Sequence, residues 1–594
     1  MVFSSLIFLF FFLPAALFCY YIVPQNFIRV RNAVLLLFSL FFYFYGEPRL
    51  IDILILSILM NYLFGLSMRS TYRKPLLILC VIANLSLLGV FKYLNFFISS
   101  ADSLFGLGIP VPDIVMPIGI SFYTFQALSY VIDVYRREVP PQHDLFSLAL
   151  YVSMFPQLIA GPIVRYHDVN VQLAVRKHSF AQFSEGISRF LFGLSKKVLL
   201  SNVFAQIADG VFKYAPNELS AAGAWMGAIG YTLQIYFDFS GYSDMAIGLG
   251  KMFGFEFLEN FNYPYISKSV TEFWRRWHIS LSTWFRDYVY IPLGGNRCPP
   301  ARHIFNLLAV WTLTGFWHGA NWTFMAWGLY FGVLLILEKK FLAEWITRLP
   351  SVLQHLYALF FIVIGWVFFR SDSMGLAVQY LGSMFTSTVP LNRFVIEYLL
   401  RFWPYLLFGV VLSAPVFPRL KSTRIWRVLE FPVLAVLFTL CLEKGSFYEN
   451  RRLAVFPVPS VETVLDGTFF SDVETYISDH FACRVPLLRL NVRKELALHN
   501  PVVSNTVIAG DTLLPYHGKP RTDYDHENMQ TVLDALSQVS AACETVGAKF
   551  VYLSIPEQSC ALRYKYPSYL TSGTYTDDSM RTDFLAGLDA RGID

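Results

Sequence analysis

The chain has 594 residues, of which 55% are hydrophobic and 17% aromatic, while charged residues make up 15%, against about 25% in an ordinary soluble protein. This composition excludes a disordered, collagen-like or coiled-coil chain and disfavours a purely soluble enzyme, because too few charges are present to coat a globule of this size. The net charge of +5 and the lack of arginine-rich or zinc-finger patterns argue against nucleic acid as a partner. The seven cysteines form no CxxC pair, so we expect no bound metal.

Charge divides the chain into two parts. Residues 1–442 carry 33 basic and 22 acidic residues, a net charge of +11, whereas residues 443–594 carry 14 basic and 20 acidic residues, a net charge of −6. The first part is poor in charge and the second is not. We therefore predict a membrane-embedded body, 1–442, followed by a separate water-exposed domain, 443–594.

The body contains a series of long apolar runs. The first run ends at Arg29, and no basic residue precedes it as in a secretory signal peptide, so we expect a retained membrane helix. Because a membrane-spanning helix needs about 20 apolar residues, we predict an all-α polytopic protein with about 10 to 12 crossings and one or two re-entrant pieces. The further runs lie near 32–46, 50–67, 75–98, 117–134, 146–164, 186–208, 221–254, 304–337, 353–369, 394–416 and 428–442.

Basic loops orient these helices. Clusters at 29–31, 69–74 and 136–137 fall on alternate connections, and the positive-inside rule makes those connections cytoplasmic. Basic residues at 165–177 also indicate the cytoplasmic side, so the run 146–164 is expected to enter the membrane and return to the side from which it came. The basic residues at 419–427 indicate that the last apolar run starts on the cytoplasmic side. The N-terminus and the 443–594 domain are thus predicted to be extracytoplasmic, in a multi-pass protein of the inner (cytoplasmic) membrane.

A histidine lies near the middle of the uncharged run 304–337. His318 stands in the segment Trp317-His318-Gly319-Ala320-Asn321-Trp322. Ionisable groups at membrane depth are costly and therefore candidate functional residues. A neutral imidazole in a dry tunnel suits general-base chemistry on a hydroxyl group. The alternative is a core histidine that hydrogen-bonds between helices.

A second segment interleaves arginines with tryptophans, from Thr271 to Trp284, and includes Arg275, Arg276 and His278. Rings and guanidinium groups both find partners at the headgroup level, so an interfacial anchoring helix is one interpretation. A functional interpretation is a cationic wall for a phosphate-bearing ligand, with His278 facing inward.

A third segment carries two carboxylates, Asp238 and Asp244, in an apolar stretch. Such groups must be hydrogen-bonded, ion-paired or in contact with water. Either could orient a catalytic histidine, and pairing to Arg275 or Arg286 as pure scaffolding is the alternative. The glycine between them, Gly241, predicts an interrupted helix, either around a cavity or buried inside the protein.

Five ordered motifs over about residues 80–370 resemble the membrane-bound O-acyltransferase family, and within it the bacterial branch of alginate O-acetylation membrane proteins. They are the segments 116–135, 155–163, 238–244, 273–280 and 316–322. The resemblance implies acyl transfer, usually of acetyl, from acetyl-CoA or another acyl-CoA as the donor substrate, with no bound cofactor. It also implies that His318 is the essential residue and His278 the second active-site residue. Asp238, Asp244, Arg275, Arg276, Trp317 and Asn321 are candidate substrate or tunnel residues.

The 443–594 domain lacks the long apolar runs of the membrane body. Residues 527–547 follow a helical pattern and 549–556 read as a buried strand, which predicts an α/β unit. Its Glu449-Asn450-Arg451 segment and the Asp-x-Phe-x-x-Arg pattern at 479–484 resemble the first part of the DHHW family, which implies an esterase-like fold of SGNH type. The Asp-His-His-Trp segment and the later serine nucleophile of that family are absent. We therefore expect a partial, non-catalytic domain. Either the sequence is a fragment, or a frame disruption has fused two gene products and truncated the second. The alternative is a small docking domain that needs no catalysis.

The leading interpretation is an O-acyltransferase that moves an acyl group outward for O-acetylation of an extracytoplasmic polysaccharide. The acceptor would be the polysaccharide itself or a separate SGNH-like acetyltransferase. Interrupted helices and buried polar groups also suit a transporter or flippase for a lipid-linked glycan. A third interpretation is a non-catalytic membrane anchor of an acetylation complex.

Overall fold

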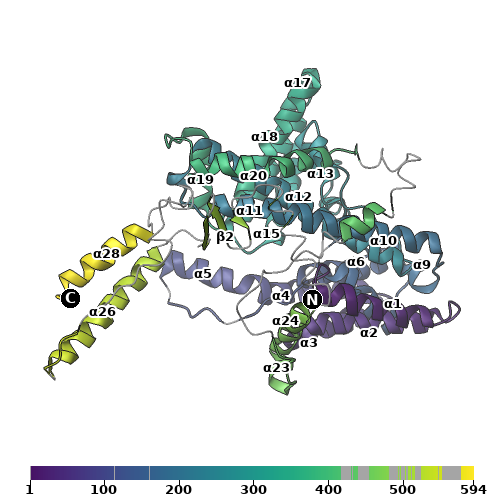
Figure 1. Ribbon diagram of the computed structural model, residues 1–594. Coiled ribbons are helices and arrows are strands. Elements are labelled where there is room, and N and C mark those ends of the chain that lie inside the picture. Colours follow the sequence, from purple (N-terminus) through teal and green to yellow (C-terminus); the bar gives the residue numbers. More distant parts are fainter. Residues whose placement is uncertain are drawn as a thin grey trace. The chain divides into compact units, whose positions relative to one another are not determined.

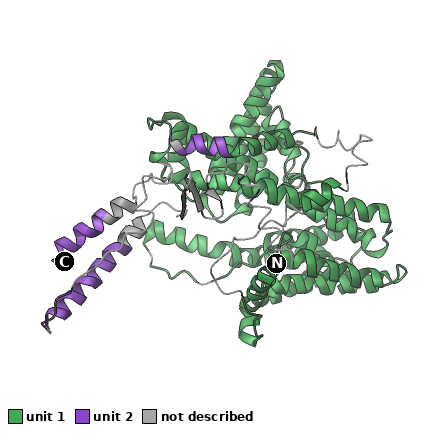
Figure 2. Cartoon of the chain, in the orientation of Figure 1, with its two compact units in different colours: residues 1–391, 402–442, 452–481 green, residues 392–401, 443–451, 482–594 purple. Residues whose placement is uncertain are grey.

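The computed structural model describes residues 2–416 except 107, 113 and 160, and beyond them residues 430, 432–438, 454–480, 493, 496, 502–503, 506–509, 512–515, 523–545, 547–550 and 577–593. The chain divides into two compact units (Figures 1 and 2). Unit 1 comprises residues 1–391, 402–442 and 452–481, and unit 2 comprises residues 392–401, 443–451 and 482–594.

The described part of unit 1 is built from helices, as the apolar runs predict. Its first half holds η1 (Phe8–Phe12), α1 (Leu13–Ile22), α2 (Ile28–Gly46), η2 (Pro48–Leu50), α3 (Ile51–Ser67), α4 (Arg73–Leu88), η3 (Gly89–Tyr93), α5 (Leu94–Phe105), α6 (Ile120–Arg136), α7 (Leu145–Ser153), α8 (Phe155–Leu158) and α9 (Tyr166–Ala174). Helices α7 and α8 are each too short to span a bilayer.

The second half of unit 1 surrounds one long helix, α12 (Ala221–Met252). The other elements are α10 (Phe180–Ser195), η4 (Lys196–Ser201), α11 (Asn202–Phe212), η5 (Pro216–Glu218), η6 (Pro264–Ile266), α13 (Val270–Arg276), α14 (Ile279–Phe285), η7 (Arg286–Tyr290), α15 (Pro300–His318), α16 (Trp322–Leu337), η8 (Glu338–Leu342), α17 (Ala343–Arg348), α18 (Ser351–Arg370) and α19 (Met374–Thr386). Helix α20 (Arg393–Leu412) follows.

Five helical stretches in the described part of the chain are long and apolar enough to cross a membrane. They are Ile28–Gly46, Pro48–Ser67, Arg73–Phe105, Ser351–Arg370 and Phe394–Leu412. The remaining apolar runs form helices that are shorter, broken or less apolar. The run 304–337, for example, is divided into α15 and α16 by Gly319–Asn321. The fold is that of an all-α polytopic membrane body.

The predicted interruption at Gly241 is wrong, since α12 continues through this residue. Gly241 instead allows close packing of α12 against α10, which lies along it (Figure 1). A Cβ on Gly241 would lie 2.8 Å from the carbonyl oxygen of Gly193, and one on Gly248 would lie 2.6 Å from that of Gly186. Small residues permit such approach between membrane helices. The glycines therefore serve helix packing and leave the backbone hydrogen bonds intact.

Two short helices after the membrane helices also belong to unit 1, α23 (Val461–Leu465) and α24 (Thr468–His480). The hydroxyl of Tyr45 donates to the carbonyl oxygen of Phe470 at 2.8 Å. Their rings lie 4.6 Å apart between centroids, and Ile7 joins the same buried cluster. This segment is thus packed onto the end of α2.

In unit 2 the described elements are the first part of α20, a three-stranded sheet and two further helices. The antiparallel strands β1 (Val502–Val503), β2 (Thr506–Ala509) and β3 (Thr512–Pro515) pair in sequence order. Helix α26 (Asp523–Thr545) confirms the predicted helix at 527–547, and it packs on α28 (Asp577–Ala590) through Leu533 and Leu588. The predicted strand 549–556 extends beyond the described residues.

Candidate active site

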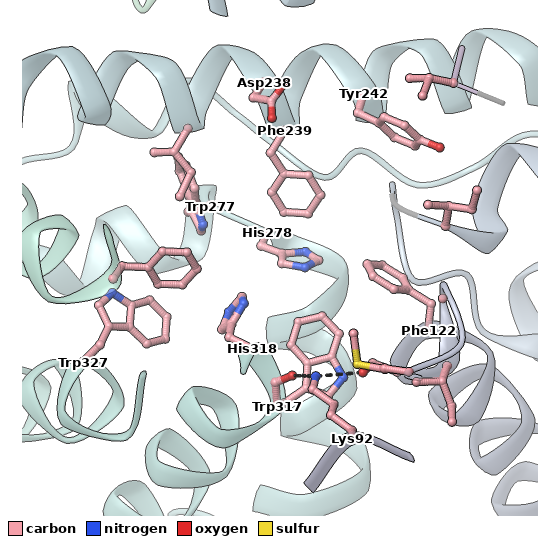
Figure 3. A pocket seen from close by; sticks show the side chains of 18 of the residues that line it. Lys92, Phe122, Asp238, Phe239, Tyr242, Trp277, His278, Trp317, His318 and Trp327 are labelled. Carbon is pink, nitrogen blue, oxygen red and sulfur yellow. Dashed lines mark hydrogen bonds between the residues drawn. The ribbon is translucent and has the colours of Figure 1, made fainter. Parts of the chain in front are cut away.

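Unit 1 encloses a cavity of about 480 Å³ among α12, the α13–α14 turn, α15 and the α5-side end of η3. Figure 3 shows that the labelled side chains converge on it. Most of its wall is aromatic or aliphatic, as in ligand pockets generally. The residues that line it are Val2, Lys92, Met116, Pro117, Gly119, Ile120, Ser121, Phe122, Ile159, Lys197, Ile235, Asp238, Phe239, Tyr242, Trp277, His278, Trp317, His318, Trp327, Trp366 and Phe369. Both predicted histidines are among them.

His278 reaches the cavity because the backbone turns there. The predicted single helix of this segment is two helices, α13 and α14, with Trp277 and His278 between them. His278 has φ of +45°, an uncommon left-handed conformation for a residue other than glycine. Such strained positions cluster at functional sites. The turn excludes one continuous anchoring helix and aims the ring inward.

Asn260 fixes which nitrogen of His278 faces the cavity. The Oδ1 atom of Asn260 lies 3.0 Å from Nδ1 of His278 and accepts a 2.8 Å hydrogen bond from Oγ of Ser280. The amide Nδ2 donates to Oγ of Ser243 at 3.1 Å. This network assigns Oδ1 as an acceptor, so Nδ1 of His278 carries the hydrogen. The buried Nε2 atom then keeps its lone pair, and no described group hydrogen-bonds to it.

His318 ends α15 at the point where the apolar run breaks. Its ring is surrounded by Trp317, Trp327 and Phe369, with centroid separations of 5.0, 5.1 and 5.2 Å. The last two rings meet it at 86° and 77°, edge-to-face arrangements that favour aromatic pairs. Nothing in the described residues hydrogen-bonds to its imidazole. His318 is therefore positioned by packing, unlike His278.

Lys92 was not predicted. It comes from η3, a π-helical turn of the kind that is frequent at functional sites. Its Nζ atom donates to Oγ of Ser121 at 2.9 Å and to the carbonyl oxygen of Trp317 (Figure 3). No described carboxylate pairs with it. A single lysine inside the apolar run 75–98 was the signal that could have identified it.

The two carboxylates of α12 have other partners than predicted. Asp244 pairs with Arg189 and Lys196, each at 2.6 Å, and Asp238 pairs with Lys197. Pairing to Arg275 or Arg286 is therefore wrong, because α10 and η4 supply the cations. Neither carboxylate hydrogen-bonds to a histidine in the described contacts. Asp238 lines the cavity and Asp244 does not.

The remaining predicted residues divide between cavity and periphery. Trp317 lines the cavity, whereas Arg275, Arg276 and Asn321 do not. Arg275 is exposed. Arg276 pairs with Glu272 at 2.9 Å. Asn321 caps α16, where its side chain accepts from the amide of Thr323.

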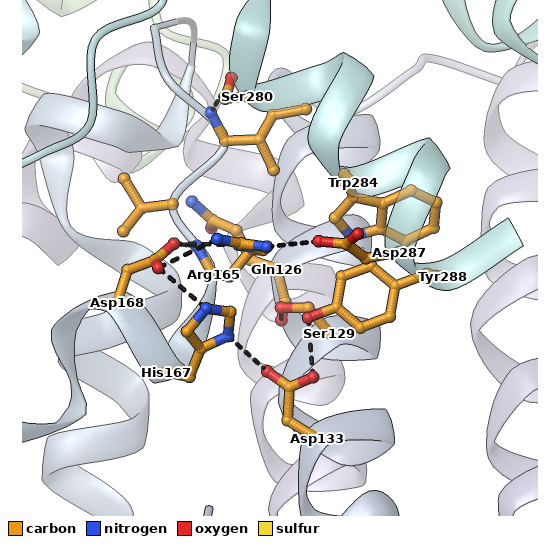
Figure 4. A network of polar contacts seen from close by, with 12 residues as sticks. Gln126, Ser129, Asp133, Arg165, His167, Asp168, Ser280, Trp284, Asp287 and Tyr288 are labelled. Carbon is orange, nitrogen blue, oxygen red and sulfur yellow. Dashed lines mark hydrogen bonds and ion pairs between the residues drawn. The ribbon is translucent and has the colours of Figure 1, made fainter. Parts of the chain in front are cut away.

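A second polar cluster lies outside the cavity, between α6, α9 and η7 (Figure 4). His167 bridges Asp133 and Asp168 at 3.2 and 3.0 Å, and the hydroxyl of Tyr288 donates to Asp133 at 2.7 Å. Arg165 joins Asp168 to Asp287. Hydrogen bonds to Asp133 and Asp168 raise the pKa of His167 to about 9. Asp133, Glu138 and His167 also bring potential metal-ligand atoms within 4.8 Å of one another, but Tyr288 and His167 already occupy both oxygens of Asp133, which makes the cluster an ion-pair network.

Comparison with known proteins identifies the family. The model of the membrane-bound O-acyltransferase family matches residues 40–371, a range that includes every ionisable residue of the cavity. The DHHW protein family matches residues 449–543.

Curated relatives agree with this match. The chain is 45% identical over 395 residues to a probable alginate O-acetylase AlgI of Azotobacter vinelandii, covering 65% of this chain and 78% of the relative. It is 45% identical over 398 residues to the probable alginate O-acetylase AlgI of Pseudomonas aeruginosa (65% and 75%). It is 34% identical over 497 residues to the peptidoglycan O-acetyltransferase of Helicobacter pylori (76% and 92%). The chain thus belongs to the membrane-bound O-acyltransferase family: it is a multi-pass membrane enzyme that transfers acyl groups to oxygen, followed by a region of the DHHW family.

Proposed function

We propose that the enzyme transfers an acyl group, acetyl in the first instance, from acyl-CoA on the cytoplasmic side to an extracytoplasmic acceptor. The acceptor is a polysaccharide, reached directly or through a separate SGNH-like acetyltransferase. The observation that carries this proposal is the shared cavity of His278, His318 and Lys92 in the membrane body. The names of the relatives, which are alginate and peptidoglycan O-acetylating proteins, support a polysaccharide acceptor.

In the proposed reaction His318 is the general base. Its imidazole takes the proton of an acceptor hydroxyl, and the hydroxyl oxygen attacks the thioester carbonyl carbon. The rings of Trp317, Trp327 and Phe369 make the surroundings of His318 apolar, and apolar surroundings limit hydrolysis of the thioester. When the carbon–sulfur bond breaks, the departing thiolate receives the proton from the imidazolium.

His278 serves the acceptor hydroxyl, and Lys92 serves the acyl group. The Nε2 lone pair of His278 faces the cavity, so this ring can accept a hydrogen bond from the hydroxyl or orient it toward His318. The ammonium of Lys92 lies on the backbone carbonyl of Trp317, next to His318 in sequence. It would stabilise the negative oxygen of the tetrahedral intermediate, as fixed donors in a dry site do.

Acyl-CoA enters the cavity from the cytoplasmic side in this proposal. Arg275 is exposed and free to meet its phosphates, whereas Arg276 is held by Glu272. The N-terminus and the DHHW-like region are placed on the extracytoplasmic side of the inner membrane, from the distribution of basic loops.

Purified protein in lipid nanodiscs tests the proposal with radiolabelled acetyl-CoA and a soluble hydroxyl acceptor. We expect His318→Ala and His278→Ala each to lower transfer by about 10²-fold or more. His143→Ala is the matched control, because His143 is exposed and outside the cavity. Wild-type levels of transfer by properly folded His318→Ala protein would refute the assignment.

A further inference from the structure

Two arginines that are far apart in the sequence are buried close together, and neither has an acidic partner among the described residues. Arg31 lies near the start of α2 and Arg176 follows α9, and each is 5% exposed. The guanidinium carbon of Arg31 lies 5.1 Å from the ring centroid of Tyr20, whose hydroxyl accepts a 3.0 Å hydrogen bond from Arg176. Neither arginine forms an ion pair with any carboxylate of the described residues.

Several other buried or half-buried cations of the membrane body are neutralised by carboxylates. Arg165, Arg189 and Lys196 each pair with at least one carboxylate, at 2.6 to 3.0 Å. A buried charge without a counterion is unfavourable, since desolvation is not repaid. Among the described residues Arg31 and Arg176 lack such a partner, as Lys92 does in the cavity, and two such charges close together favour an external anion.

The hydrogen bonds of the pair go to neutral groups. Arg31 donates to the carbonyl oxygen of Val23 at 2.9 Å. Arg176 donates to the carbonyl oxygen of Gln172 at 2.9 Å and to the side-chain oxygen of Asn32 at 2.6 Å. One nitrogen of each guanidinium, Nη1 of Arg31 and Nε of Arg176, is buried with no partner. Two strong donors are therefore left unused.

A histidine completes the cluster. Nε2 of His178 lies 2.9 Å from the hydroxyl of Tyr20, and its buried Nδ1 atom also has no partner. Gly254, with φ of +81°, leaves room for this ring, because a Cβ there would lie 2.8 Å from Nε2. Burial, together with the charges of Arg31 and Arg176, lowers the pKa of His178 to about 4, so the ring is neutral at pH 7.

The cluster lies at the end of a helix that is long and apolar enough to cross the bilayer. It joins the end of α1 to the beginning of α2, and α2 is one of the helices able to cross the bilayer. Exposed basic residues flank both arginines, Arg29 on one side and Lys177 on the other. Positively charged residues at this position indicate the cytoplasmic surface, where phosphates of lipids and of soluble cofactors are both present.

We propose that Arg31, Arg176 and His178 form a binding site for the phosphate group of a phosphate ester, separate from the acyl-transfer cavity. None of the three lines that cavity. Guanidinium groups suit phosphate because they present several donors in a plane. The ester is a phospholipid headgroup or a phosphorylated soluble molecule such as coenzyme A, and the place of the site at the end of a candidate membrane-spanning helix favours the headgroup.

Native mass spectrometry of the full-length protein, purified in detergent and stripped of lipid, tests the proposal. Dioleoylphosphatidylglycerol, dioleoylphosphatidylcholine and coenzyme A are added separately. We expect saturable binding of phosphatidylglycerol or coenzyme A, weakened about tenfold or more in Arg31→Gln and Arg176→Gln, because charge-assisted hydrogen bonds are lost. Phosphatidylcholine should bind more weakly than phosphatidylglycerol, because its choline cation offsets the charge of its phosphate. Arg29→Gln and Lys177→Gln are matched controls that remove an exposed charge from the same segments and should bind as the wild type does.

The three additions separate the sources of the phosphate. Binding of the anionic lipid that the two glutamine variants weaken identifies a headgroup site. Binding of coenzyme A identifies a soluble ester only where the same variants weaken it, because coenzyme A is also expected at the acyl-transfer site. Equal loss in the exposed-charge controls would overturn the site in favour of general surface attraction.

Should the buried variants fail to fold, the wild type alone still decides. Its unfolding temperature should rise with phosphatidylglycerol or with glycerol 3-phosphate, a soluble phosphate ester unrelated to the acyl donor, and not with sodium chloride at equal ionic strength. The absence of any such rise would overturn the proposal. Acyl transfer plays no part in either measurement, so failure of the proposed reaction would leave this site untouched.

Discussion

Nδ1 of His278 lies 3.0 Å from Oδ1 of Asn260, and this single contact determines which ring nitrogen is directed toward the cavity. The acceptor character of Oδ1 follows from Ser280, which donates to it at 2.8 Å. Outer hydrogen bonds of this type fix the tautomer and orientation of functional histidines. Asn260 is thus a positioning residue that does not line the cavity.

Asn260→Ala is expected to lower kcat for acyl transfer by about 10- to 100-fold, because His278 loses both its orientation and its tautomer. Asn260→Asp should retain more activity and move the pH profile, since a carboxylate stabilises the protonated ring. The measurements are kcat, KM and the pH dependence of transfer. Asn262→Ala is the control, because Asn262 is exposed and two positions away. An unchanged pH profile in Asn260→Asp would contradict a positioning role.

Lys92→Met is expected to reduce kcat by about 10²- to 10³-fold, the usual effect of removing one donor to a developing oxyanion. KM for the acyl donor should change little, because the negative charge develops in the transition state. Single-turnover kinetics with acetyl-CoA would measure the chemical step directly.

Lys74→Met is the control for Lys92→Met, since it removes an exposed lysine at the start of the same helical stretch. A larger effect on KM than on kcat would indicate that Lys92 binds the ground-state substrate and would argue against stabilisation of the oxyanion.

The sequence was sufficient for the two histidines but not for their partners. His318 and His278 lie in motifs with unusual local composition, and the structure places both on one cavity. Asn260 and Lys92 carry no local signal of comparable strength, because their roles arise from contacts across 18 and 225 residues of sequence. Nonlocal hydrogen bonds of this kind follow from the fold rather than from spacing.

The sequence was also insufficient to predict the partners of the carboxylates and the continuity of α12. Asp244 needed a cation, but nothing in its neighbourhood of the sequence distinguished Arg189 and Lys196 from the nearer arginines. Gly241 read as a break because glycine lowers helix propensity. In α12 the gain from packing against Gly193 outweighs that local cost.

Gly241→Ala is therefore expected to destabilise the protein by about 1–3 kcal/mol, the usual cost of overpacking. The added methyl group would lie 2.8 Å from the carbonyl oxygen of Gly193, so α10 and α12 would have to separate. Gly382→Ala, within α19, is the matched control, because its methyl group would meet nothing within 4 Å. That control should be neutral or slightly stabilising. Unfolding temperatures of the two purified variants test the difference, and equal values would contradict the packing role of Gly241.

The ion-pair network around His167 predicts a loss of stability at high pH. Hydrogen bonds to Asp133 and Asp168 raise the pKa of His167 to about 9, from about 6.5 in the unfolded chain. A raised pKa means that the folded protein binds the proton more tightly. The stabilisation is then complete below about pH 6.5 and is lost as the pH rises through about 9.

The unfolding temperature of the wild type, measured between pH 6 and pH 10, should accordingly fall more steeply above pH 7 than that of His167→Gln, which has no proton to lose at this position. His143→Gln should follow the wild type, because His143 is exposed and lies outside the network. Parallel curves for the wild type and His167→Gln would mean that His167 is not charged in the folded protein. The bridge between α6 and α9 would then consist of neutral hydrogen bonds, and the two carboxylates would have to be held by Arg165 and Tyr288 alone.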